Sequence, residues 1–119
     1  MPEREDFRTV QYLYLTTTGR KTGSPREIEI WFVHHAGRFY ILAEHFHRAQ
    51  WVRNILADPA VRVRIAGREF NATARVLDEQ ADAALYKLAQ RLEREKYSWG
   101  DGLPVEITPD EFERVTPNR

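Results

Sequence analysis

The chain has 119 residues, of which 42% are apolar and 30% are charged, which is typical of a folded protein with one hydrophobic core. Lys and Arg together number 18, as do Asp and Glu, so no overall positive field would attract nucleic acid or an anionic membrane. The absence of cysteine excludes disulfides, thiol catalysis and zinc–thiolate sites. We therefore expect a single domain over residues 1–119 that does not bind nucleic acid.

The sequence predicts neither a membrane segment nor a secretory signal. No apolar run approaches the ~20 residues that a membrane-spanning helix needs. The amino-terminal stretch MPEREDFR is too charged for a signal peptide. We expect no integral membrane segment and a cytoplasmic location.

The first part of the chain is typical of three strands joined by short turns. The first strand ends in three threonines, which favour extended backbone. The second alternates at first and then becomes apolar on both faces at Trp31, Phe32 and Val33, which predicts packing on both sides and would also suit a dimer interface. The predicted strands are 12–18, 26–35 and 39–43, and the turns between them are 19–25 and 36–38.

The rest of the chain predicts two helices and up to three strands. Trp51 and Ile55 recur at helical spacing, and the DP sequence at 58–59 stops that helix. A second, longer helix has apolar residues on one stripe and charges opposite. The predicted ranges are a helix at 47–57, strands at 61–65 and 70–76, a helix at 79–95, an aromatic loop at 97–104, a strand at 105–108 and a short element of uncertain type at 110–115.

Five or six short strands, mostly joined by hairpin-length turns, favour a small antiparallel β-barrel. The two helices would then pack against its outside. An open α+β sheet is the alternative, because the pattern of strands alone does not distinguish a closed sheet from an open one.

The turn at 19–26 is the strongest local signal. Its glycines allow the backbone to turn sharply, while Arg20, Lys21 and Arg26 offer the donors that bind phosphate and carboxylate. The order of residues is not that of a phosphate-binding P-loop, and no helix follows. The alternative is a solvent-exposed hairpin with ordinary turn residues.

Trp51 and Asn54 form a second candidate site. They lie about one turn apart and so share a face of the predicted helix. A large ring and an amide could hold a planar heterocycle by stacking and hydrogen bonding. Alternatively, Trp51 belongs to the core and Asn54 is an ordinary residue near the end of the helix.

The four histidines do not form a recognisable metal site. His34 and His35 are adjacent in a predicted strand and would point to opposite faces. His45 and His47, with Glu44, have no partner at a fixed spacing. We predict no metal site and expect these side chains to border a pocket or the surface. Arg62 and Arg64, among matching acidic residues, are expected on a solvated strand face.

Three segments of the sequence resemble the deazaflavin-dependent nitroreductase family, also called DUF385. They are TTTGRKTGSPR, GRFYILA and WVRNILADPAVRVRI, and the resemblance extends from about residue 12 to about residue 108. It implies a split β-barrel, six-stranded and antiparallel, with two or three flanking helices, like that of flavin-binding proteins. It also implies an oxidoreductase that uses coenzyme F-420, a deazaflavin with a phosphorylated and polyglutamylated tail, as a two-electron donor.

The resemblance assigns roles to residues of this chain. It makes Tyr97 a candidate proton donor or substrate contact and places Trp31 at the substrate end of the site. Because the sequence does not require a particular catalytic acid, we add His45 as a second catalytic candidate. The residues implied in binding the cofactor are Arg20, Lys21, Thr22, Arg26, Ala43, Glu44, Trp51 and Asn54.

The stretch AEHFHRAQW departs from the family pattern. Family members commonly have a glycine-rich loop with Ser and Lys here, whereas this chain has no glycine and places an anion at Glu44. His45 or Arg48 would have to offset that charge near a phosphate. FMN is therefore the alternative cofactor.

Three functional hypotheses follow from these observations. The first is a reductase that transfers a hydride from reduced deazaflavin to a quinone, an enone or a nitroaromatic. The second is a non-catalytic protein that binds FMN or another flavin-like or lipid-like ligand in the same cleft. The third is a barrel that only dimerises. A homodimer is compatible with all three.

Overall fold

The computed structural model describes residues 7–110, which form seven β-strands, two α-helices and one 3₁₀ turn. The elements are β1 (Leu13–Thr18), β2 (Pro25–Ile30), β3 (Val33–His35), β4 (Arg38–Ala43), η1 (Phe46–Arg48), α1 (Gln50–Ala57), β5 (Ala60–Ile65), β6 (Arg68–Val76), α2 (Ala83–Tyr97) and β7 (Leu103–Pro109). No helix within this range is long and apolar enough to span a membrane.

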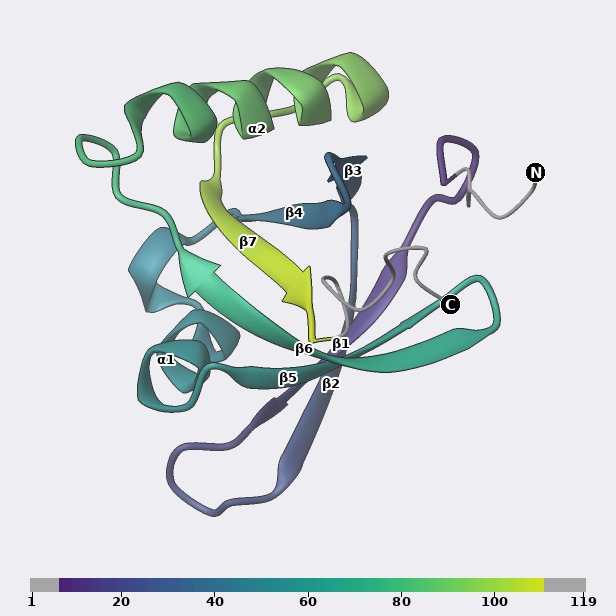
Figure 1. The fold of residues 1–119 in the computed structure, drawn as a ribbon. Helices are drawn as coiled ribbons and strands as arrows, with labels where there is room; N and C mark the ends of the chain where they lie inside the picture. The colour runs from purple at the N-terminus through teal and green to yellow at the C-terminus, as the bar shows by residue number, and fades with distance from the viewer. Residues whose placement is uncertain (1–6, 111–119) are drawn as a thin grey trace.

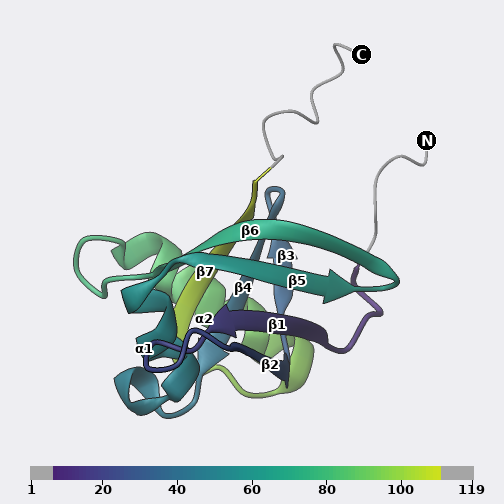
Figure 2. The same ribbon diagram turned by 90° about the horizontal axis from the view of Figure 1, so that it is seen from below.

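A single antiparallel sheet contains all seven strands, in the order β2-β1-β5-β6-β7-β4-β3. The two edge strands, β2 and β3, are consecutive in the sequence and are joined only by Trp31 and Phe32. Because so short a link cannot cross a flat sheet of this width, the sheet must curl until its two edges meet. Figures 1 and 2 show the resulting half-barrel.

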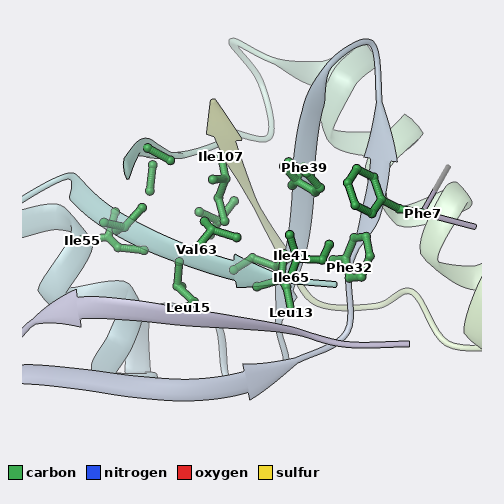
Figure 3. Packing of buried hydrophobic residues seen from close by; sticks show 14 residues of the cluster. Phe7, Leu13, Leu15, Phe32, Phe39, Ile41, Ile55, Val63, Ile65 and Ile107 are labelled. Carbon is green, nitrogen blue, oxygen red and sulfur yellow. The ribbon is translucent and has the colours of Figure 1, made fainter. Parts of the chain in front are cut away.

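The interior of the curl is filled by alternate residues of the strands. Leu13 and Leu15 of β1 and Val63 and Ile65 of β5 point inward, as the two-residue period of a strand requires. Figure 3 shows these side chains meeting Phe39, Ile41 and Ile107 from the opposite strands. Fourteen buried residues form this cluster. This core holds the two edges of the sheet in place.

The helices cover different parts of the curl. Helix α2 crosses β4 and β3 (Figure 1), so Tyr40 packs beneath Ala89 while Phe39 and Ile41 enter the core. This explains why β4 is buried on both faces. Helix α1 lies beside β1 and β6, where Ile55 enters the core and Val52 joins a smaller cluster with Tyr86.

The predicted second strand, 26–35, is in fact two strands. The chain leaves one edge of the sheet at Ile30 and joins the other edge at Val33, which raises the number of strands from the expected five or six to seven. The expectation of a dimer face at residues 31–33 is also wrong for Phe32 and Val33, since the chain itself buries them.

Both predicted helices begin later than expected. Phe46–Arg48 form a separate 3₁₀ turn instead of the first turn of α1, and Phe46 has a positive φ of 52°, outside the α-helical region. Before α2, the carboxylate of Asp78 accepts hydrogen bonds from the amides of Gln80 and Ala81, which forms a separate turn. Helix α2 then extends two residues beyond the predicted end, to Tyr97.

The last strand begins at Leu103 instead of 105, and most of the predicted terminal element at 110–115 lies outside the described residues. The aromatic loop before this strand packs tightly on α2. Gly100 allows the loop to approach α2, and Gly102 allows it to approach the end of β4, because a β-carbon on Gly102 would lie 2.8 Å from the carbonyl oxygen of Ala43.

We expect Gly100→Ala to destabilise the protein. A β-carbon at this position would overlap the carbonyl oxygen of Gln90, which belongs to the helix backbone and cannot rotate away. The free energy of unfolding, measured by chemical denaturation, should fall by about 1–3 kcal/mol. Asp101→Ala is the matched control, because Asp101 is exposed and its ion pair with Arg94 lies at the surface. If both variants are as stable as the parent protein, the described packing of this loop is wrong.

Candidate active site

A groove lies beside the edge strand β2, between that strand, the end of β4 and the two helices. Its wide half has a volume of about 590 Å³. This half is lined by the segment before β1, strand β2 and the link after it, the end of β4, the two helices and the loop after α2. The lining residues used below are Tyr12, Ile28, Glu29, Trp31, Leu42, Glu44, His45, Trp51, Glu93 and Trp99.

The narrow half of the groove adjoins the turn between β1 and β2 and has a volume of about 360 Å³. Arg20, Lys21, Thr22 and Arg26 line it, together with Gln50 and Asn54 of α1. Ile28 and Trp51 line both halves, so the two hollows adjoin at these side chains. The groove therefore runs from the three cations, past the indole of Trp51, to an aromatic chamber.

Hydrogen bonds within the β1–β2 turn fix its shape. The amide of Gly19 donates to the carbonyl of Ser24 at 2.7 Å, and the amide of Gly23 donates to the carbonyl of Gly19 at 2.7 Å. The hydroxyl of Thr22 accepts from the amide of Ser24 at 3.1 Å. Gly23 has a φ of +78°, a conformation that favours glycine. The cations thus project from an ordered turn.

Asn54 positions Arg20. Its side-chain oxygen accepts from the amide of Arg20 at 3.1 Å and from the guanidinium at 2.9 Å, while its amide group donates to Thr17 at 3.1 Å. Gln50 accepts a further bond from the same guanidinium at 2.8 Å. Asn54 is only 4% exposed, so these contacts satisfy a buried polar group. Helix α1 and the cation turn are therefore locked together.

Lys21 and Arg26 are exposed, and their side chains have no hydrogen bond or ion pair within the part of the chain that the structure describes. Both line the narrow half of the groove. By contrast, Arg62 and Arg64 pair across strands with Glu69 and Glu27, as expected for a solvated face. Lys21 and Arg26 thus remain available to bind an anion.

The three candidates at the end of β4 occupy different environments. Glu44 and His45 are exposed and line the wide half of the groove. Ala43 is 1% exposed and pairs with Leu103 in the sheet, so its side chain belongs to a core cluster.

Trp31 and Tyr97 form a stacked pair, with ring centroids 4.4 Å apart and planes 4° from parallel. Trp31 lines the wide half of the groove and is 37% exposed. The hydroxyl of Tyr97 accepts from the amide of Phe32 at 3.1 Å and lies 2.8 Å from the carbonyl of Gln11 and 2.9 Å from that of Phe32, to either of which it can donate. Burial raises the pKa of Tyr97 to about 12. The hydroxyl therefore anchors the link between the sheet edges.

Lys96 reinforces the same anchor. Its ammonium group donates to the carbonyls of Val10 and Phe32, at 2.9 and 3.1 Å, and lies 4.0 Å from the centre of the Phe32 ring. The end of α2 thus holds both the segment before β1 and the crossover from β2 to β3.

Glu93 is the main feature that the sequence-based analysis missed. Its side chain lines the wide half of the groove, yet the residue is only 1% exposed, and its Oε2 has no hydrogen-bond partner within residues 7–110. Burial raises the pKa of this carboxyl to about 8, and the nearby Lys96 only partly opposes that shift. A signal was present, because Glu93 follows Tyr86 and Ala89 at helical spacing on the buried face of α2.

The charges divide along the groove. Arg20, Lys21 and Arg26 line the narrow half, whereas the exposed carboxyl groups of Glu29 and Glu44 line the wide half. An elongated ligand with an anionic tail and an uncharged head would match this distribution. Within residues 7–110, no group of three or more His, Cys, Asp or Glu side chains is arranged to hold a metal ion.

The chain belongs to a family of oxidoreductases. Residues 3–108 match the model of the F420H2-dependent quinone reductase family, where F420H2 denotes reduced coenzyme F-420. This match covers most of the chain, and it confirms the deazaflavin-dependent reductase activity and cofactor that the resemblance implied.

Solved structures agree with this assignment. An F420-H2 dependent reductase is 26% identical, with a TM-score of 0.56 over 81% of this chain and 91% of that one. A protein described as a domain-swapped dimer is 28% identical, with a TM-score of 0.58 over 81% of this chain and 78% of that one.

The fold itself extends to more distant proteins. The heme storage protein HutZ from Vibrio cholerae is 20% identical, with a TM-score of 0.71 over 92% of this chain and 89% of that one. At this identity the similarity shows the fold alone. Flavin-binding proteins share the same fold, and the predicted split β-barrel is thus confirmed, with seven strands instead of six.

We expect Tyr97→Phe to destabilise the protein although it retains the ring that stacks on Trp31. The change leaves the partly buried amide of Phe32 without its acceptor, so the free energy of unfolding should fall by about 1–3 kcal/mol in chemical denaturation. Tyr14→Phe is the matched control, because the hydroxyl of Tyr14 makes one exposed bond to Glu29. Equal stability of the two variants would show that Tyr97 does not anchor the crossover.

Proposed function

We propose that this protein reduces a neutral, planar acceptor such as a quinone, with reduced coenzyme F-420 bound along the groove. One observation carries the proposal: in a chain of the F420H2-dependent quinone reductase family, a turn with three cations adjoins an aromatic chamber at Trp51. An enone or a nitroaromatic would offer the same flat shape and the same need for two electrons.

The residues present fit this cofactor. Lys21 and Arg26 have free donors for the phosphate and the glutamates of the tail, and Arg20 is held in place by Asn54 and Gln50. The exposed backbone and side chain of Thr22 lie on the same turn. Trp51 at the junction offers an indole face beside which a flat ring can lie.

Bound reduced coenzyme F-420 would supply a hydride, and the protein would supply orientation, exclusion of water and a proton. The wide half of the groove suits an uncharged acceptor, because Tyr12, Trp31, Leu42 and Trp99 provide apolar and aromatic surface there. The carboxyl groups of that half disfavour an anionic acceptor. The distribution of charge therefore favours the anionic tail of the cofactor in the narrow half and the uncharged acceptor in the wide half.

The other predicted residues take roles consistent with their places. Trp31 forms one wall of the acceptor site. The backbone of Ala43 and the side chain of Glu44 stand at the end of β4, and the exposed His45 lines the wide half next to them as a candidate acid. Tyr97 supports Trp31 from behind by stacking on it. FMN, with one phosphate for the same cations, is the alternative cofactor.

We also propose that the protein forms a homodimer. A 28% identical structure is described as a domain-swapped dimer, and β2 is an edge strand whose outer residues are largely exposed. Sedimentation equilibrium should give twice the mass of one chain at micromolar concentration. The mass of a single chain would contradict this proposal.

We expect the double substitution Lys21→Ala and Arg26→Ala to weaken binding of coenzyme F-420 about 100-fold or more. Each charged hydrogen bond contributes roughly 1.5–3 kcal/mol, and every 1.4 kcal/mol is about a tenfold change in affinity. Fluorescence titration measures the dissociation constant. Arg62→Ala is the matched control, since it removes an exposed cation that lies on another strand face.

The same titration with the deazaflavin ring system that lacks phosphate and glutamates distinguishes binding of the ring from binding of the anionic tail. Its affinity should be unchanged by the double substitution, because Lys21 and Arg26 line only the narrow half. If the double variant binds the complete cofactor as tightly as the parent protein does, the turn is not the tail site.

A further inference from the structure

Glu93 is a buried acid without a partner. It is 1% exposed, and its Oε2 makes no hydrogen bond within the described residues. The nearby cation, Lys96, donates instead to the carbonyls of Val10 and Phe32. A buried carboxylate without an ion pair or hydrogen bonds is unfavourable, so this group is held in its neutral, protonated form.

The groups that face Glu93 come from several elements, and none of them gives it a hydrogen bond at Oε2. Lys96 and Tyr97 lie on its own helix, Glu29 on β2, Tyr12 before β1, and Glu44 and His45 after β4. The carboxylate of Glu29 accepts a hydrogen bond from the hydroxyl of Tyr14. The hydroxyl of Tyr97 is engaged with the backbone of Phe32. Burial is thus the main cause that keeps Glu93 neutral, and only Lys96 opposes it.

The position of Glu93 matches that of an acid that acts on the acceptor. It lines the wide half of the groove together with Trp31 and Trp99, where we place the acceptor, and not the narrow half with the cations. Tyr97 is less suited to this task, because its hydroxyl is engaged with Phe32 and its pKa is raised to about 12. His45 is exposed at the rim.

We propose that Glu93 is a catalytic residue that donates a proton to the oxygen of the acceptor during reduction. This inference rests on the proposed function, which supplies the reductant. The acceptor gains both electrons with a hydride from the reduced deazaflavin, while the O–H bond of Glu93 breaks and a new O–H bond forms on the acceptor oxygen. The carboxylate that remains regains its proton from solvent.

The test compares Glu93→Gln with Glu95→Gln. Glutamine has nearly the same shape as the acid but has no proton to transfer, and Glu95 is an exposed residue of the same helix. With menadione as acceptor, kcat of Glu93→Gln should fall about 100-fold or more, while Glu95→Gln stays near the parent value. The affinity for coenzyme F-420 should be unchanged in both variants.

A structural role for Glu93 would not depend on the acceptor, whereas proton donation does. The loss of kcat should be much smaller with a halogenated benzoquinone, since its reduced oxygen is less basic and needs less help from an acid. The kcat of the parent protein should also decline as pH rises through the pKa of Glu93, and that decline should be absent in Glu93→Gln.

Measurements without cofactor provide an independent readout. Carbon-13 NMR of glutamate-labelled protein should show one carboxyl that titrates near pH 8 and is missing from Glu93→Gln. Because the folded-state pKa lies above the ordinary value of 4.5, the folded protein should lose stability as pH rises between these two values. Glu93→Gln should remove that dependence. If Glu93→Gln does not fold, Glu93→Leu, which also has no proton to donate, is used in its place.

The outcomes distinguish the two proposals. If the parent protein turns over menadione and Glu93→Gln does so equally fast, the role of Glu93 is wrong and the proposed function stands. If the parent protein neither binds coenzyme F-420 nor reduces any quinone, the proposed function fails and the role of Glu93 fails with it. A carboxyl that titrates near its ordinary pKa would also overturn the role of Glu93.

Discussion

The link between the two edges of the sheet is the constraint on which the structure depends. Trp31 and Phe32 alone connect β2 to β3, which stand at opposite ends of the seven-stranded order. This link forces the curl, and the groove lies beside the link and the edge strand β2. The same two residues then serve both parts of the molecule, because Phe32 is wholly buried in the core while Trp31 lines the wide half. Tyr97 and Lys96 hold the link from outside through its backbone. Fold and site therefore share one set of contacts, so that loosening the crossover would disturb both.

The second theme is the separation of charge in a chain whose net charge is zero. Local electrostatics can be strong without a global field, because cations are gathered on one turn and carboxyl groups around the chamber. Asn54 contributes to this by fixing Arg20 against α1, which lowers the entropy that the side chain loses when an anion binds. Glu44, which conflicts with the family pattern if it lies near a phosphate, lines the half of the groove away from the cations. Its charge then favours a neutral acceptor and does not oppose the tail.

The sequence predicted the local features well and the distant ones poorly. The alternation in β5 and β6 and the cations between β1 and β2 depend on neighbouring residues, so period and composition were sufficient. The break at Trp31 was hidden because an apolar run looks alike whether one strand or two contain it. The bond between Asn54 and Arg20 spans 34 positions, and no local pattern reveals such a partner. Glu93 could have been found as a charge on the apolar stripe of its helix, since its register was already visible.

Glu93 also shows why stability alone does not explain this site. A leucine at this position would keep the apolar face of α2 continuous and would avoid burying a carboxyl without a partner. A structural ion pair with Lys96 would be one reason to retain the acid, but the ammonium of Lys96 already bonds to two carbonyls of the crossover. Local departures from the rules of packing concentrate where a protein performs chemistry. The buried acid faces the chamber in which a reduced acceptor would need a proton, so the residue that weakens the helix packing is also the one placed to complete the reaction.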